Sequence, residues 1–143
     1  MLAAVILAAP LIAPAYAIGP VRLGERRASV ERALGPGHVI ARPKTELGKF
    51  VVVKYAGAKL TVTYASAGSR APVTSISTIS TRFHTPRGVG VGSPVRAVKH
   101  RYPSVSCAGA VCTLGKLVPG HAVTSFYVRG RHVVRVAVGV VID

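Results

Sequence analysis

The phrase "VRLGERRASVERALG" at residues 21–35 returns 68 residues further on as "VGVGSPVRAVKHRYP" at residues 89–103. Each copy opens with an apolar residue, any residue, a second apolar residue and a glycine, so that Gly24 falls on Gly92. After the glycine, apolar residues stand three or four positions apart, which is the spacing of one helix face. The repeat therefore predicts that this chain uses the same entry to a short helix twice.

Both expected helices have recognisable ends. Ser93 can cap the free backbone amides of the second helix, and Pro94 suits its first position because the N–H that proline lacks is not needed there. Gly35 and Pro103 then end the first and the second helix. We expect the apolar stripes of the two helices to face a core; they are Val30, Ala33 and Leu34, and Val95, Val98 and Tyr102.

Segments rich in β-branched residues follow each helix. At 58–64, apolar and polar side chains alternate, which is typical of an antiparallel sheet with one buried and one solvated face. Along 132–141 we expect the even-numbered valines to share the buried face. Because Val73 falls on Val141 at the same offset of 68, the strands repeat only approximately, and a short strand at 38–42 is expected in the first copy alone. The other expected strands lie at 49–55, 58–64, 73–80, 111–117, 122–128 and 132–141.

The sequence thus predicts an α+β fold of two tandem units. Each unit is a short helix followed by an antiparallel three-stranded meander, with a sheet that is wet on one face. We place the first unit at 18–85 and the second at 86–143. Neither could bury enough apolar surface alone, so we expect the two units to pack or pair side by side.

The first 17 residues, "MLAAVILAAPLIAPAYA", are uncharged and apolar and end in a small-x-small triplet. This pattern predicts a signal peptide at 1–17 and a location in the cell envelope or the medium. The usual basic n-region is missing, so either the start codon is misplaced upstream or the signal is atypical. A buried strand or helix is the alternative to a signal peptide. Pro10, Pro14 and the short apolar length argue against a membrane-spanning segment.

Cys107 and Cys112 are the two cysteines of the chain. In an exported protein, two cysteines so close together predict a local disulfide. The loop between them is short, so we expect the bond mainly to fix local geometry. Two thiols without clustered histidines argue against a metal site, and a redox pair more often has two intervening residues.

The chain has few residues that could carry out acid–base chemistry or bind a metal. The only acids are Glu25, Glu31, Glu46 and Asp143, and no two of them form a paired-carboxylate site. The run "GVGVGS" at 88–93 resembles a phosphate loop but lacks the lysine that would follow, and the helix entry explains its glycines. We therefore expect no enzyme activity, no metal and no cofactor. The histidines lack zinc-ligand spacing; they are His38, His84, His100, His121 and His132.

Charge points to binding instead. The chain has 19 Lys and Arg against 4 acidic residues, a net charge of +15, and such a potential attracts anionic polymers, anionic membrane surfaces and acidic proteins. We predict a binding face on the solvated side of the sheets for an acidic protein or an anionic envelope polymer, through contacts that weaken with salt. No nucleic-acid reading motif is present, so specific nucleic-acid binding is not expected. The alternative is that the charges serve solubility and keep sheet edges unpaired. The predicted face consists of Lys54, Lys59, Arg129, Arg131 and Arg135.

The doubled apolar-x-apolar-Gly entry, short helix and three-stranded meander resemble the tandem repeat of the β-lactamase-inhibitory proteins of actinobacteria. They also resemble the related small outer-membrane assembly lipoprotein modules, which use one copy. The resemblance implies a secreted binder whose concave sheet and protruding hairpin plug an enzyme cleft. This chain departs from those inhibitors in having no Trp, one Cys pair where they carry one per repeat, and no lipid-anchoring Cys. We therefore carry over the architecture and no inhibitory residue.

Together these observations predict an exported, non-enzymatic protein-binding module of the inhibitor-like or envelope-assembly type. The alternative is a polyanion-binding or structural cell-envelope protein that acts through a basic sheet face.

Overall fold

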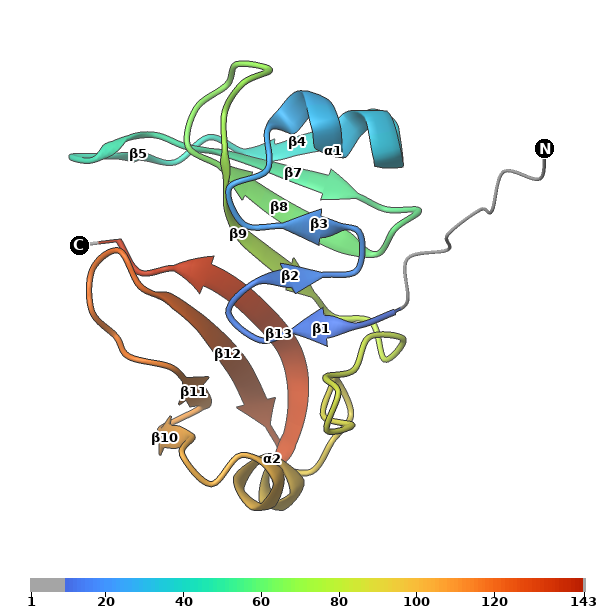
Figure 1. The fold of residues 1–143 in the computed structure, drawn as a ribbon, viewed down its shortest axis with the longest axis vertical. Coiled ribbons are helices and arrows are strands. Elements are labelled where there is room, and N and C mark those ends of the chain that lie inside the picture. Colours follow the sequence, from blue (N-terminus) through green and yellow to red (C-terminus); the bar gives the residue numbers. More distant parts are fainter. Residues whose placement is uncertain (1–9, 143) are drawn as a thin grey trace.

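The computed structural model describes residues 10–142, and a single eight-stranded sheet organises them (Figure 1). Every neighbouring pair in this sheet is antiparallel, in the order β10–β11–β12–β13–β9–β8–β7–β4. The pairing of β9 with β13 joins strands from the two halves of the chain. The strands are β4 (His38–Ala41), β7 (Val51–Tyr55), β8 (Leu60–Tyr64), β9 (Val73–Thr78), β10 (Ser106–Ala108), β11 (Val111–Leu114), β12 (Ala122–Arg129) and β13 (His132–Val140).

Two helices and a small sheet lie against one face of the large sheet. The buried valines of α1 (Arg27–Leu34) and α2 (Val95–Arg101) belong to the same core as the strands. The small sheet is formed by β1 (Ile12–Ala13), β2 (Ala17–Ile18) and β3 (Val21–Arg22), and its last two strands contact β9. Figure 1 shows it in front of the large sheet, between the two helices. The fold class is therefore α+β with mostly antiparallel sheets, as expected.

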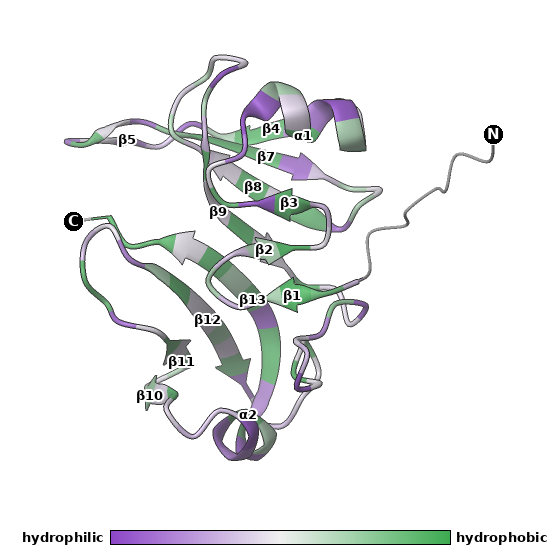
Figure 2. Cartoon of the chain, in the orientation of Figure 1, coloured by the Kyte–Doolittle hydropathy of each residue, from purple (hydrophilic) through white to green (hydrophobic). Residues whose placement is uncertain are grey.

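Alternation along the strands places the core on this covered face. Leu60, Val62 and Tyr64 of β8 are all buried, as the sequence predicted. Under α2, the rings of Tyr102 and Phe126 stack with centroids 6.3 Å apart. Hydrophobic residues recur along the strands of the large sheet and along β1–β3 (Figure 2). Burial of these side chains is the main favourable contribution to the stability of the fold.

The two glycine phrases are fastened to the large sheet by the same pattern of backbone hydrogen bonds. Gly24 and Gly92 have φ values of 80° and 94°, in the left-handed region that favours glycine. Each glycine donates to a strand of the large sheet, and the strand donates back to the residue that follows the glycine. Val73 thus has the role of Val133, and not that of Val141 as the fixed offset suggested. The bonds are Gly24 N–H to Val73 O (2.8 Å), Val73 N–H to Glu25 O (2.8 Å), Gly92 N–H to Val133 O (2.7 Å) and Val133 N–H to Ser93 O (2.9 Å).

Some local predictions were wrong. Pro94, and not Ser93, is the N-cap of α2, and the Ser93 hydroxyl instead accepts a hydrogen bond from Gly90 N–H at 3.0 Å. A bulge between β12 and β13 buries Val133 in place of Val134, so that of the even-numbered valines only Val136 and Val138 are buried. A fourth strand, β10, also precedes the three expected in the second half. It was missed because its three residues, of which only Cys107 is half-buried, give little sequence signal.

The segment expected to be a signal peptide contributes to the core where the structure describes it. Ile12 is fully buried, and Ala17 is buried as well. Ile12 N–H donates to His84 O (2.8 Å), and Ala15 N–H donates to the Thr124 hydroxyl (2.8 Å). Within residues 10–17, strand structure is therefore limited to β1 and the start of β2. The signal peptide at 1–17 stays a prediction, and its residues 1–9 lie outside the described part.

Two further features complete the fold. Cys107 and Cys112 face each other on β10 and β11 and form the predicted disulfide, which is typical of oxidising, extracytoplasmic compartments. A separate hairpin, β5 (Lys44–Thr45) and β6 (Gly48–Lys49), projects beyond the sheet (Figure 1). Neither helix within residues 10–142 has the length and apolar sequence that crossing a membrane would need.

Candidate binding groove

The face of the large sheet opposite the helices carries a groove of about 840 Å³. The small side chains of Thr61 and Ser77, partners on β8 and β9, form its floor. The same row of partners continues to Lys54 on β7 and to Ala137 on β13. Ser77 and Ala137 are only 7% and 8% exposed although they belong to the open face. The floor of the groove is therefore recessed between larger neighbours.

Three cationic side chains line the groove: Lys54, Lys59 and Arg135. Lys54 lies on β7 and Lys59 in the turn before β8, whereas Arg135 comes from β13 on the other half of the chain. The guanidinium of Arg135 lies 5.1 Å from the ring centroid of Tyr127 on the neighbouring strand. This cation–π contact restricts where the charge of Arg135 lies.

Two exposed isoleucines also line the groove. Ile79, just after β9, is 74% exposed, and Ile40 on β4 is 51% exposed. The hydroxyls of Thr61, Ser80 and Thr81 accompany them. The groove thus combines cations, hydrogen-bonding hydroxyls and apolar side chains, and no carboxylate is among its lining residues.

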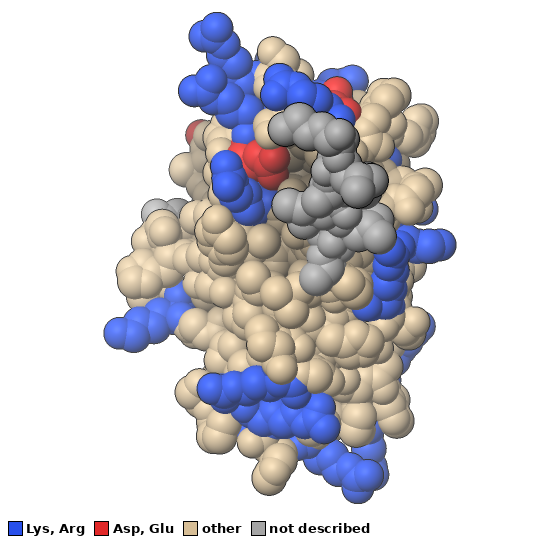
Figure 3. Space-filling model, turned by 45° about the vertical axis from the view of Figure 1, so that its right-hand side comes forward, with Lys and Arg blue, Asp and Glu red and all other residues tan. Residues whose placement is uncertain are grey.

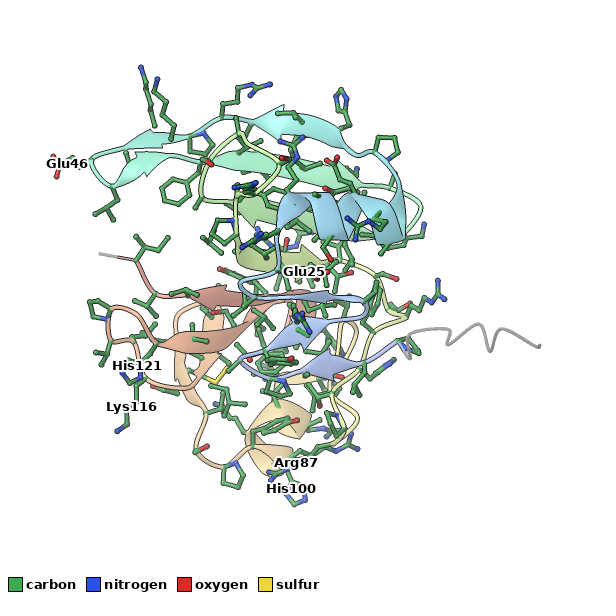
Figure 4. The ribbon with its side chains drawn as sticks, turned by 45° about the horizontal axis from the view of Figure 1, so that its top comes forward. Glu25, Glu46, Arg87, His100, Lys116 and His121 are labelled. Carbon is green, nitrogen blue, oxygen red and sulfur yellow. A yellow bond between two sulfur atoms is a disulfide. The ribbon has the colours of Figure 1, made fainter. Side chains whose placement is uncertain are left out.

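The acids in the described part of the chain lie elsewhere. Glu31 pairs with Arg27 at 2.9 Å, and Glu25 accepts hydrogen bonds from Ser29 Oγ (2.7 Å) and from Arg22 N–H (3.2 Å). Figure 4 shows Glu46 at the tip of the β5–β6 hairpin. Figure 3 shows the acids only in the upper part of the face it draws, whereas Lys and Arg occur in both its upper and its lower part. No internal carboxylate therefore neutralises the cations of the groove within residues 10–142.

The structure separates the five residues of the predicted binding face. Lys54, Lys59 and Arg135 come together in the groove, as described above. Arg129 and Arg131 lie at the β12–β13 turn, and Arg131 lines a second pocket together with Arg96 and His132. Sequence reasoning missed Arg96, because it lies on a helix expected only to pack.

A polar cluster fastens α1 to the sheet. The Tyr55 and Tyr64 hydroxyls are 2.7 Å apart, and Tyr55 Oη also donates to Glu31 (3.3 Å). The bond to Glu31 raises the pKa of Arg27, and burial raises the pKa of Tyr55 and Tyr64 above the ordinary phenol value. Because these three pKa values are raised, the two phenols and the guanidinium keep their protons and their hydrogen-bond partners. We therefore assign the cluster to the stability of the fold.

Candidate metal ligands remain scattered. Within residues 10–142, no three His, Cys, Asp or Glu side chains lie close enough together to share a metal ion. The glycine run at 88–93 enters α2, and Gly90 packs its Cα against the backbone of Phe83, where a Cβ would approach within 2.2 Å of the carbonyl oxygen. Gly90 therefore serves close backbone packing, and Gly92 serves the turn at positive φ.

Comparison with protein families, with curated proteins and with solved structures found no match to this chain.

Proposed function

We propose that this protein is an exported, non-enzymatic binding module that holds an acidic segment of a partner protein in the groove of its large sheet. One observation carries the proposal: three cations and two exposed isoleucines share one groove that has no carboxylate lining. Exposed cations and exposed apolar side chains side by side complement a protein segment that has both acidic and apolar residues.

The proposal includes a tandem architecture. One unit comprises α1 with β4, β7, β8 and β9, and the other comprises α2 with β10–β13. The matching bonds of Gly24 and Gly92 support it, as does the pairing of β9 with β13 at the centre of the sheet. On this view each unit is a helix followed by four strands, and the groove spans the junction of the two. The resemblance to the inhibitory proteins and assembly lipoprotein modules enters at this level only.

The groove favours a protein over a simple polyanion. Ile79 and Ile40 would gain nothing from an anionic polysaccharide or polyphosphate, whereas burying them against an apolar side chain contributes favourably. The second candidate, a polyanion-binding envelope protein, is supported by the charge outside the groove. Arg96, Lys99 and Arg101 on α2 are exposed cations that the groove does not use.

Binding of two labelled probes separates these candidates. The first is a peptide in which aspartate alternates with leucine, and the second is polyaspartate of the same charge. A protein-binding groove should bind the first probe more tightly and keep it at about 0.5 M salt, where the screening length is roughly 4 Å. Equal binding of both probes, lost together at that salt concentration, would favour the polyanion candidate.

Charge reversal locates the site. We expect K54E/K59E/R135E to abolish peptide binding, and I79S to weaken it without changing the net charge. K44E/K49E/K116E makes the same change of charge at exposed lysines outside the groove and should keep most of the affinity. Equal losses in the two triple variants would show that net charge, and not the groove, governs binding. Circular dichroism checks that each variant is folded.

A further inference from the structure

A second pocket lies where the start of α2 meets the β12–β13 turn. It has a volume of about 330 Å³ and is lined by Pro94, Val95, Arg96, Arg131 and His132. We propose that this pocket binds a tetrahedral oxyanion, such as the terminal phosphate group of a larger ligand, between the guanidinium groups of Arg96 and Arg131. The site is separate from the groove and does not depend on the function proposed for it.

Backbone hydrogen bonds hold the two sides of this pocket together. Val95 N–H donates to Arg131 O at 2.9 Å, and Val133 N–H donates to Ser93 O at 2.9 Å. Pro94 and His132 form an isolated bridge between these two bonds. The two arginines therefore start from backbone positions that are already fixed, which lowers the entropy lost when they close on an anion.

The residue types suit a phosphate group. A guanidinium presents planar, permanently charged N–H donors that match phosphate oxygens in pairs. His132 Nδ1 lies 3.0 Å from Gly130 O, and because a carbonyl only accepts, Nδ1 carries the hydrogen of this bond. The bond orients the imidazole ring as one wall of the pocket.

The α1 end of the fold shows why this pocket needs an external anion. There the helix is held to the sheet by an equivalent backbone bond, from Arg27 N–H to Ala71 O at 3.0 Å. We call this set of backbone bonds between helix entry and strand the frame of each helix. The side chain of Arg27, however, already pairs with Glu31. At the offset of 68, the position of Glu31 is occupied on α2 by Lys99. A carboxylate of the chain thus neutralises the first frame, whereas no carboxylate lines the pocket in the second.

Arg131 occupies a backbone conformation that glycine would adopt more readily. Gly130 and Arg131 form the turn, with φ values of 59° and 65°. Two such residues in succession are typical of a type I′ hairpin turn, in which a side chain at positive φ costs stability. Glycine at 131 would remove this cost together with the guanidinium. The turn therefore does not require arginine at this position.

The test is an NMR titration of the full chain with inorganic phosphate at constant ionic strength. We expect saturable shifts at the amides of residues 92–98 and 130–133. R96A and R131G should each bind phosphate roughly tenfold more weakly, the effect of losing one charge-assisted contact. K99E, which places a carboxylate near Arg96, should compete with phosphate to a similar extent.

Two controls make the result specific. R129A removes a neighbouring charge of the same turn that lines neither the groove nor this pocket, and it should keep affinity within twofold of the wild type. R131G should melt at the same or a higher temperature than the wild type, because the turn accepts glycine. This separates loss of the anion contact from loss of the fold.

A second arm distinguishes the source of the phosphate. Vesicles containing phosphatidic acid present the group on a lipid, and glycerol 3-phosphate presents it in solution. Binding of either one that is lost in R96A and R131G supports the proposal and names the source. The proposal is overturned if the wild type binds neither the two carriers nor phosphate, or if R129A loses as much affinity as R131G.

Discussion

Around α1, the carboxylates of Glu25 and Glu31 are satisfied within the chain: one accepts from the Ser29 hydroxyl and the other pairs with Arg27. Around α2, the corresponding positions in the sequence are Ser93 and Lys99. The backbone frame is the same at both ends, because each glycine phrase makes the same bonds to its strand. The difference shows that a packing frame can be kept while its charge is either neutralised internally or left available to a ligand.

The cores beneath the helices differ as well. Under α1, the hydroxyls of Tyr55 and Tyr64 bond to each other at 2.7 Å. Under α2, Tyr102 stacks on Phe126, which has no hydroxyl. The first end therefore depends on buried polar bonds and the second on apolar packing.

The largest effect should come from removing the segment that touches both halves of the large sheet. A chain that begins at Ile18 loses the fully buried Ile12, the β1–β2 pairing and the bond from Ala15 to Thr124 on β12. We expect it to lose at least about 4 kcal/mol of stability in urea unfolding. A chain that lacks only residues 1–9 is the control. Equal stability of the two chains would mean that residues 10–17 are dispensable, as cleavage after Ala17 requires.

Truncating Val30 of α1 and Val98 of α2 to alanine tests whether the two helices pack equally well on the sheet. Val30 and Val98 are 1% and 0% exposed. V30A and V98A should each cost about 2 kcal/mol, because each removes two buried methyl groups and leaves a cavity. Urea midpoints measure both. A difference larger than about 1 kcal/mol would show that one helix packs more loosely than its burial indicates.

The stability of the α1 end, which contains Tyr55 and Tyr64, should fall as the pH rises into the alkaline range. Burial raises the pKa of Tyr64 and Tyr55, so the folded protein holds these protons more tightly than the unfolded chain does. Their contribution is complete below the ordinary phenol pKa of about 10 and is lost as pH rises above it, by up to ~1.4 kcal/mol per pH unit for each phenol. Urea midpoints between pH 8 and pH 11 should fall less steeply for Y55F/Y64F. Parallel profiles for the variant and the wild type would contradict this assignment.

The two entry glycines give the smallest and most direct comparison. A Cβ at Gly24 would meet no atom within 4 Å, and at Gly92 only Thr81 Cγ2 at 3.9 Å, so conformational strain alone decides the cost of alanine. G24A and G92A should each lose about 1 kcal/mol in thermal or urea unfolding, since both residues have positive φ. Unequal losses would mean that the two phrases are not equivalent in strain.

Local patterns predicted much of this fold because their causes are local. Helix periodicity, the alternation along β8 and the close spacing of Cys107 and Cys112 each depend on neighbouring residues. The pairing of β9 with β13 depends on residues about 60 positions apart in sequence, for example Ile76 and Val138, and strand periodicity says nothing about such partners. The strands β1–β3 were missed because two-residue strands carry no measurable period.

The binding groove was predicted only in part, because strand alternation is a local pattern and the pairing of distant strands is not. Alternation placed Lys59 and Arg135 on the solvated face, and Lys54 was expected near its edge. Only the sheet order could show that the three share a groove. Arg96 could have been found from the aligned phrases, in which Lys99 replaces Glu31 and leaves the helix without an acid.

The uneven placement of the acids also equalises the charge of the two halves of the chain. Glu25, Glu31 and Glu46 lie in residues 10–85 together with eleven Lys and Arg, whereas residues 86–142 carry eight Lys and Arg and no acid. The net charge of each half is therefore +8. An anionic surface should attract both ends of the large sheet about equally. We therefore expect approach without a preferred orientation, and local contacts decide which face stays bound.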